Sequence, residues 1–283
     1  MKKIFLVAVL LTSIVVMSCE ETPTSEVYRK EVVINGTLFA GQNVDTVWLN
    51  WTGYVNQYYD PKALAISDAS VIIRGVDVAF YDSLVHDPLN PGRYYSTNPL
   101  NKIQPTKTYK ITITTPAPDV RVVTAQTTVP DTFSITYTSL KEGDTIQYNL
   151  LAPAHEFSWS PSRFQETYLP TIRYLDSGAA MIPKSFYGDT TSTDFRRPDK
   201  VDYRIGMPKD QTNTLLPWVF LSYYGNVQFE VYAVDFNYSD FINQIIPAQG
   251  GELREIRYQV QGGIGVFGSK SKATGAFKIY LRP

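Results

Sequence analysis

Hydrophobic and polar residues alternate with a period of two along much of this 283-residue chain. The segment Thr108–Thr114 alternates without a break, and Asp45–Trp51 places Val47, Leu49 and Trp51 on one face. This spacing predicts strands that bury one face. Comparable runs predict further strands over Val32–Leu38, Ala69–Gly75, Val78–Tyr81, Val120–Val129, Phe133–Tyr137, Glu156–Pro161, Tyr168–Leu175, Val227–Val234 and Gly275–Leu281.

Helical periodicity is weak by comparison. It is confined to Tyr238–Ile246, where Ser239 or Asp240 is the expected N-cap and Pro247 is expected to end the helix. The 20 tyrosines favour strands, and the 18 prolines and 17 glycines supply turns. We therefore predict less than about 10% helix, where soluble domains usually have about 30–35%.

The strands fall into two groups. About seven short strands over roughly 100 residues predict an immunoglobulin/transthyretin-like β-sandwich at residues 31–131. Glu156–Pro161 resembles the early strand of fibronectin type III modules, in which a tryptophan (here Trp159) faces the core. We therefore predict an all-β chain, with a second, fibronectin type III-like domain at residues 132–283.

The N-terminus predicts export. A basic start is followed by the apolar run Ile4–Met17, which is shorter than the roughly 20 residues of a bilayer span but has the length of a signal-peptide core. The run ends in Val16-Met17-Ser18-Cys19, which resembles the lipobox of bacterial lipoproteins. The resemblance implies a signal peptide at residues 1–18, cleavage before Cys19 and lipid on the Cys19 sulfur. An ordinary signal peptide is the alternative, but Cys19 is the only cysteine and stands where a lipobox needs it.

Residues 19–30 are predicted to form a lipidated tether. Residues 19–26 are polar and acidic, with no periodicity. Glu20-Glu21 resembles the acidic export signal of surface lipoproteins in Bacteroidetes, and a merely solvated tether fits equally well. Together these features predict a protein anchored by lipid to the outer membrane and displayed at the cell surface.

The net charge of the chain limits the kinds of partner that it can bind. The formal net charge is −1, and cleavage before Cys19 would remove Lys2 and Lys3, leaving −3. Such a chain has no basic footprint for nucleic acid, so we expect no nucleic-acid partner. With Cys19 lipidated, the core would be held without disulfides.

An ordered set of segments resembles the DUF4249 lipoprotein family of Bacteroidetes. The resemblance runs from about Val32 to Arg282 and is weakest across residues 140–220. It implies no catalytic residues, and it implies an envelope role beside a TonB-dependent outer-membrane receptor. The segments are VVINGTL, DTVWLNW, DASVIIRG, PGRYYS, KTYKITI, TAQTTVP, VYAVDFNYSDFINQI and VQGGIGVFGS.

Two motifs imitate ligand sites. Gly263–Gly268 fits GxGxxG, but a dinucleotide site needs a strand-to-helix turn and a later acidic residue, and no Asp or Glu follows Gly268. A glycine-rich bend with close backbone approach is the better interpretation. Asp235–Asp240 begins like a calcium loop but lacks the glycine and glutamate that an EF-hand requires. Asp189 and Asp194 could ligate calcium irregularly, although solvated loop acids are the simpler reading.

Catalysis has little support. The chain has two histidines and contains no GxSxG, HExxH or paired-histidine zinc spacing. We therefore expect a protein that is not an enzyme and holds no cofactor and no metal. A hydrolase with two carboxylates about 5–9 Å apart stays open, because such pairing is spatial.

Aromatic loops are the best candidates for a binding surface. Trp51, Tyr54, Tyr58 and Tyr59 cluster in one predicted loop, and rigid rings anchor sugars or protein partners at low entropy cost. Phe186-Tyr187 and Tyr223-Tyr224 are weaker candidates. The alternative is that these rings cover the ends of the two cores. We predict a binding or accessory module whose ligand is a glycan or a peptide; the rival is a structural envelope protein without a small ligand.

Overall fold

The computed structural model describes residues 28–54, 57–177, 179–182, 202–204, 206–249 and 256–283. Within them the secondary structure is mostly β, with an α-helix, α2 (Phe236–Gln249), and a short 3-10 turn, η4 (Trp218–Phe220). The strands are β1 Val32–Phe39, β2 Val47–Trp51, β3 Ser70–Gly75, β4 Tyr81–His86, β5 Arg93–Tyr95, β6 Thr108–Thr114, β7 Val122–Thr128, β8 Ile135–Thr138, β9 Thr145–Gln147, β10 His155–Trp159, β11 Thr167–Tyr174, β12 Asp202–Arg204, β13 Met207–Pro208, β14 Asn213–Leu216, β15 Gly225–Val234, β16 Val260–Gln261, β17 Ile264–Lys272 and β18 Phe277–Arg282.

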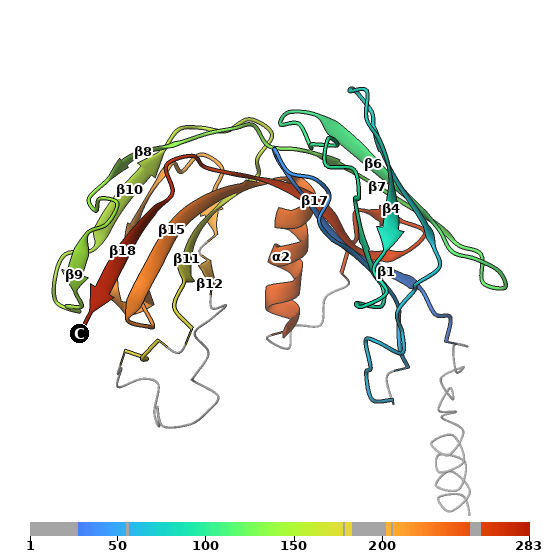
Figure 1. Ribbon diagram of the computed structural model, residues 1–283, viewed down its shortest axis with the longest axis horizontal. Coiled ribbons are helices and arrows are strands. Elements are labelled where there is room, and N and C mark those ends of the chain that lie inside the picture. Colours follow the sequence, from blue (N-terminus) through green and yellow to red (C-terminus); the bar gives the residue numbers. More distant parts are fainter. Residues whose placement is uncertain (1–27, 55–56, 178, 183–201, 205, 250–255) are drawn as a thin grey trace, which may run out of the picture.

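Most strands belong to one large mixed sheet of 15 strands, whose main path runs β12-β11-β15-β17-β1-β2-β5-β4-β3-β6-β7-β16. Seen from the side, the strands form an arch, and α2 projects from its centre into the concave side (Figure 1). A separate three-stranded sheet has the order β14-β10-β8. The mostly β prediction is therefore confirmed.

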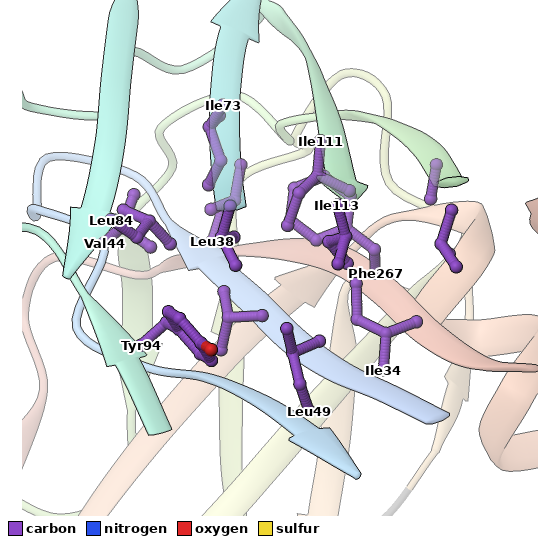
Figure 2. Close-up of a cluster of buried hydrophobic side chains, with 14 of the residues drawn as sticks. Ile34, Leu38, Val44, Leu49, Ile73, Leu84, Tyr94, Ile111, Ile113 and Phe267 are labelled. Atoms are coloured by element: carbon purple, nitrogen blue, oxygen red, sulfur yellow. The ribbon is translucent and has the colours of Figure 1, made fainter. Parts of the chain in front are cut away.

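The first hydrophobic core lies between β1 and β2 on one side and β3 and β6 on the other (Figure 2). Its strands bury alternate residues, as their period of two predicts: Ile34 and Leu38 on β1, and Ile111 and Ile113 on β6, are fully buried. Phe267 on β17 fills the same core, although it comes from the far end of the chain.

The second core lies between the sheet β14-β10-β8 and the strands β11, β15 and β18. Trp159 on β10 is 2% exposed and contacts the ring of Tyr168 at 5.4 Å between centroids. The prediction that Trp159 faces the core is confirmed. The two cores correspond to residues 32–129 and 133–281, except that Val260 and Phe267 belong to the first.

The two halves are joined by β17. It pairs in parallel with β1, from Val33↔Ile264 to Phe39↔Lys270, and antiparallel with β15. Gly265 has φ +109°, and a Cβ there would lie 2.0 Å from the carbonyl oxygen of Ile34. The expected close backbone approach in the glycine-rich segment is confirmed, but the segment is a strand and not a bend. The predicted domain boundary at residue 131 stays a prediction. The pairing of β1 with β17 connects segments on the two sides of that boundary.

Other boundaries differ from the sequence predictions. The strand expected at Val78–Tyr81 is instead β4, Tyr81–His86, and β9, β14, β16 and β17 were not predicted. Helix α2 begins earlier than expected and continues through Pro247 to Gln249. Within the described residues, no helix is long and apolar enough to cross a membrane. The signal peptide, Cys19 and residues 19–27 of the predicted tether lie outside the described part of the chain.

Candidate functional site

The loop between β2 and β3 carries the aromatic residues that the sequence singled out. The loop leaves and re-enters the sheet at one point, because the Trp51 N–H donates to the Leu64 carbonyl at 2.7 Å and Asn50 bridges to Ala65. Its first residue is held from the other side, where the Thr52 N–H donates to the Glu31 carbonyl at 2.9 Å. The base of the loop is therefore fixed while its aromatic side chains project outward.

Tyr28 forms one wall beside this loop. Its hydroxyl donates to the Thr52 carbonyl at 2.5 Å and lies 2.6 Å from Thr52 Oγ1, and its ring centroid is 4.2 Å from that of Tyr54. Tyr28 precedes β1 (Val32–Phe39), so the segment just before the first strand lies against this loop. Tyr28 and Lys30 belong to the segment that is predicted to be a tether. The aromatic side chain of Tyr28 is the feature of that segment that could have indicated a contact with the fold.

Lys30 contacts the same site and is paired with an acidic residue. Its Nζ lies 4.5 Å from the ring centroid of Trp51 and 2.7 Å from Asp119 Oδ2. The hydrogen bond from Lys30 and its charge lower the pKa of the Asp119 carboxyl. Lys30 thus covers one face of the Trp51 ring, and Asp119 balances its charge.

Together these residues surround a hollow of about 500 Å³, which we call the aromatic hollow. It is lined by Tyr28, Lys30, Trp51, Thr52, Gly53, Tyr54, Gln57, Tyr58, Tyr59, Asp60, Ala63 and Leu64. The structure therefore brings together all four predicted binding residues, Trp51, Tyr54, Tyr58 and Tyr59. Tyr54 is 55% exposed, Tyr58 95% and Tyr59 59%, whereas Trp51 packs against the first core.

The other aromatic candidate pairs fare differently. Tyr223 is 5% exposed and belongs to the second core, and Tyr224 packs against it. The interpretation of this pair as a binding surface is wrong, because Tyr223 and Tyr224 cover a core. Phe186-Tyr187 and the possible calcium ligands Asp189 and Asp194 lie outside the described residues.

A family model described as "Domain of unknown function (DUF4249)" matches residues 20–276. This chain belongs to the DUF4249 family. The match confirms the family resemblance seen in the sequence.

Among solved structures, the DUF4249 chain is similar to two chicken proteins with fibronectin type III domains. The CNTN1 FN1–FN3 domains match with a TM-score of 0.30 and 11% identity, covering 89% of this chain and 67% of that one. A two-domain fibronectin type III segment of tenascin matches with a TM-score of 0.22 and 12% identity, covering 73% and 92%. A comparison with curated protein sequences finds no match.

A second polar feature of this DUF4249 protein is the buried carboxylate of Asp235, at the start of α2. The Thr127 hydroxyl donates to Oδ2 at 2.5 Å, and the N–H groups of Ser269 and Tyr238 each donate to Oδ1 at 3.0 Å. Asp235 is thus the N-cap of α2, and the prediction of Ser239 or Asp240 is wrong.

Burial raises the pKa of Asp235 from 3.8 to about 6, and the hydrogen bonds from Thr127, Ser269 and Tyr238 limit the rise. Thr127 lies on β7, Ser269 on β17 and Tyr238 on α2. One carboxylate therefore ties the first half of the chain to the helix and to the strand that joins the halves. This arrangement is a structural junction, since both carboxylate oxygens of Asp235 accept from donors on these elements.

A third polar feature is Glu230, which lies on β15 and is 2% exposed. Burial raises the pKa of its carboxyl, but the hydrogen bonds from Lys272 and Tyr232 and the charges of Lys272 and Arg173 outweigh it and lower the pKa overall. Lys272 Nζ is 2.5 Å from Oε1, and Arg173 Nη2 is 3.4 Å from Oε2. A carboxyl held ionised in this way is poorly suited to act as a general acid.

The described part of the chain contains no group of three or more His, Cys, Asp or Glu side chains placed to hold a metal. The His155 ring packs against Trp218 in a tilted arrangement, with 4.7 Å between ring centroids, and burial lowers the pKa of His155. The expectation of no enzyme, no cofactor and no metal stays a prediction.

Proposed function

We propose that this protein is a lipid-anchored module of the outer membrane, displayed at the cell surface, which binds through the aromatic hollow and works beside a TonB-dependent receptor. Its two predicted β-sandwiches, immunoglobulin/transthyretin-like and then fibronectin type III-like, would serve as the scaffold. The observation that carries the proposal is the gathering of Tyr54, Tyr58 and Tyr59, all more than half exposed, around one hollow. Large rings left in solvent on a fixed loop base are typical of contact surfaces.

The position of the hollow supports a role close to the membrane. Tyr28 lies in its wall, and Cys19 precedes Tyr28 by nine residues, which span at most about 32 Å when extended. If Cys19 carries lipid, the hollow works within that distance of the membrane surface. With a mature net charge of about −3, the protein gains little from anionic head groups, so a neighbouring protein or its cargo is the better partner.

Replacing Cys19 with alanine tests the anchor. We expect Cys19→Ala to abolish incorporation of labelled fatty acid and to leave the precursor uncleaved, because both reactions need the cysteine thiol. The measurement is metabolic labelling with an alkyne fatty acid, followed by electrophoresis and mass determination of the N-terminus. Acylated, processed protein from the variant would contradict the lipoprotein assignment. Surface display is tested separately by protease accessibility of the wild type in intact cells.

The triple variant Tyr54→Ser, Tyr58→Ser, Tyr59→Ser tests the contact surface. We expect it to lose most of its capture of a TonB-dependent receptor from solubilised native membranes, because three anchor rings are removed. Its melting temperature should stay within about 3 °C of the wild type, since exposed side chains contribute little to stability. The measurement is quantitative mass spectrometry of proteins that co-purify with the tagged full chain.

The matched control removes three tyrosines that are about half exposed from strands elsewhere, by Tyr81→Ser, Tyr137→Ser and Tyr280→Ser. Their rings are 55%, 53% and 47% exposed. We expect this control to capture the receptor as the wild type does. If the hollow variant captures it equally well, or if it melts many degrees earlier, the three tyrosines are core cover and the site is wrong.

A further inference from the structure

We infer that the aromatic hollow binds a neutral, soluble oligosaccharide of a few pyranose units. This inference rests on the proposed function and names the ligand class of that same site. It starts from the rings: a pyranose presents a flat face of C–H groups, and such a face packs on the face of an aromatic ring. Tyr54, Tyr58 and Tyr59 offer exposed rings around about 500 Å³, a volume in the usual range for small-ligand sites.

Several side-chain hydrogen-bonding groups beside these rings have no partner among the described residues. The hydroxyls of Tyr58 and Tyr59 and the side-chain amide of Gln57 make no hydrogen bond to other described residues. Asp60 Oδ1 accepts from the Lys62 N–H at 3.0 Å, which fixes the carboxylate and leaves Oδ2 with no donor in the described part of the chain. Sugars carry hydroxyls around the rim of their apolar faces, so rings flanked by free amide, hydroxyl and carboxylate groups match them.

The charge of the hollow favours a neutral ligand. Its lining has one cation, Lys30, and one anion, Asp60, and Lys30 is already paired with Asp119 at 2.7 Å. A phosphorylated or strongly acidic ligand would need a free cation here, and a polycationic ligand would need more than one carboxylate. The residues that line the hollow offer neither a free cation nor a second carboxylate.

The backbone of the loop disfavours an extended peptide. Peptides that add to a sheet rely on unpaired main-chain groups at a strand edge. Here the N–H groups of Trp51, Thr52 and Leu64 already donate to carbonyls within the protein, and Lys62 N–H donates to Asp60. The N–H groups at the base of the loop are therefore already paired, and the exposed rings and polar side chains favour a soluble sugar over an extended peptide.

The test is titration of the purified full chain, in a non-glycosidic detergent, with maltotriose, cellotriose, triacetylchitotriose and mannotriose. Saturation-transfer NMR should show contact to the ring C–H protons of at least one of these sugars, and its affinity should be almost independent of salt. We expect the variant Y54S/Y58S/Y59S to weaken this binding by about tenfold or more, and Asp60→Asn to weaken it by a smaller factor. The control Y81S/Y137S/Y280S should bind as the wild type does.

Two results would overturn the inference. One is the absence of binding for all four sugars up to about 10 mM; the other is equal binding by the Y54S/Y58S/Y59S variant and the wild type. These failures are distinct from failure of the proposed function. Receptor capture that depends on the three tyrosines without sugar binding would retain the module and reject its ligand class, whereas sugar binding without receptor capture would do the reverse.

Discussion

Phe267→Ala should lower the free energy of unfolding by about 4 kcal/mol, the middle of the range for a buried phenylalanine. Phe267 is fully buried in the first core, among side chains of β1, β2 and β6 (Figure 2). Its ring fits against Gly36, where an added Cβ would lie 3.2 Å from Phe267 Cδ2. Because this ring comes from β17, its loss also removes one of the side chains, together with Val260, by which the last part of the chain fills the first core. The measurement is urea denaturation followed by tryptophan fluorescence.

A matched control is Phe236→Ala, which makes the same chemical change at a ring that is 53% exposed. We expect this control to cost less than about 1 kcal/mol. An equal loss of stability in the two variants would mean that Phe267 does not hold the halves together as the structure indicates.

Asp235→Ala should cost about 3 kcal/mol at pH 7. The substitution leaves the Thr127 hydroxyl and the N–H groups of Ser269 and Tyr238 without their acceptor, and each buried donor left unpaired costs about 1–3 kcal/mol. Asp235→Asn is the matched control. Its amide oxygen can accept from both N–H groups and its amide nitrogen can donate to Thr127, so its stability at pH 7 should be near or above that of the wild type. A loss for Asn as large as for Ala would show that the charge itself is needed.

The same pair predicts a pH dependence. Because the pKa of Asp235 is raised from 3.8 to about 6, the folded state holds a proton that the unfolded state has released between these values. The part of the stability that depends on protonated Asp235 is therefore complete below pH about 4 and is lost as the pH rises through about 6. The rise in pKa corresponds to about 3 kcal/mol. Relative to Asp235→Asn, the wild type should lose about this much unfolding free energy between pH 4 and 7; a constant difference would contradict the raised pKa.

Strand positions could be predicted because they follow from local alternation. Residues 108–114 and 227–234 show the period of two, and β6 and β15 form there. The strand β17 could not be predicted in the same way, since Gly263, Gly265 and Gly268 interrupt the pattern. Each of these glycines lies where a Cβ would meet another segment of the chain within 3 Å. The glycines thus indicated that another segment approaches this part of the chain closely, but not which segment it is.

The candidate site was predictable in part. Trp51, Tyr54, Tyr58 and Tyr59 are close in sequence, so their loop brings them together whatever the rest of the fold does. Tyr28 and Lys30 were missed because they are distant from the loop in sequence and contact it only in the folded chain. The acceptor role of Asp235 was missed because two of its donors lie on the distant strands β7 and β17. Tyr223 and Tyr224 were overrated, since sequence does not distinguish an aromatic pair that covers a core from one that meets solvent.

By itself the sequence determined that this chain is mostly β, that it belongs to the DUF4249 family, and that one loop concentrates aromatic residues. Each of these depends on residues that are near one another in the chain or on their ordered set. Only the tertiary structure decided that β1 pairs in parallel with β17, that Phe267 completes the first core, and that Tyr28 lines the aromatic hollow. These features depend on which distant segments pack against one another. The alternation of hydrophobic and polar residues predicts that a strand has a buried face, but it does not predict which segment covers that face.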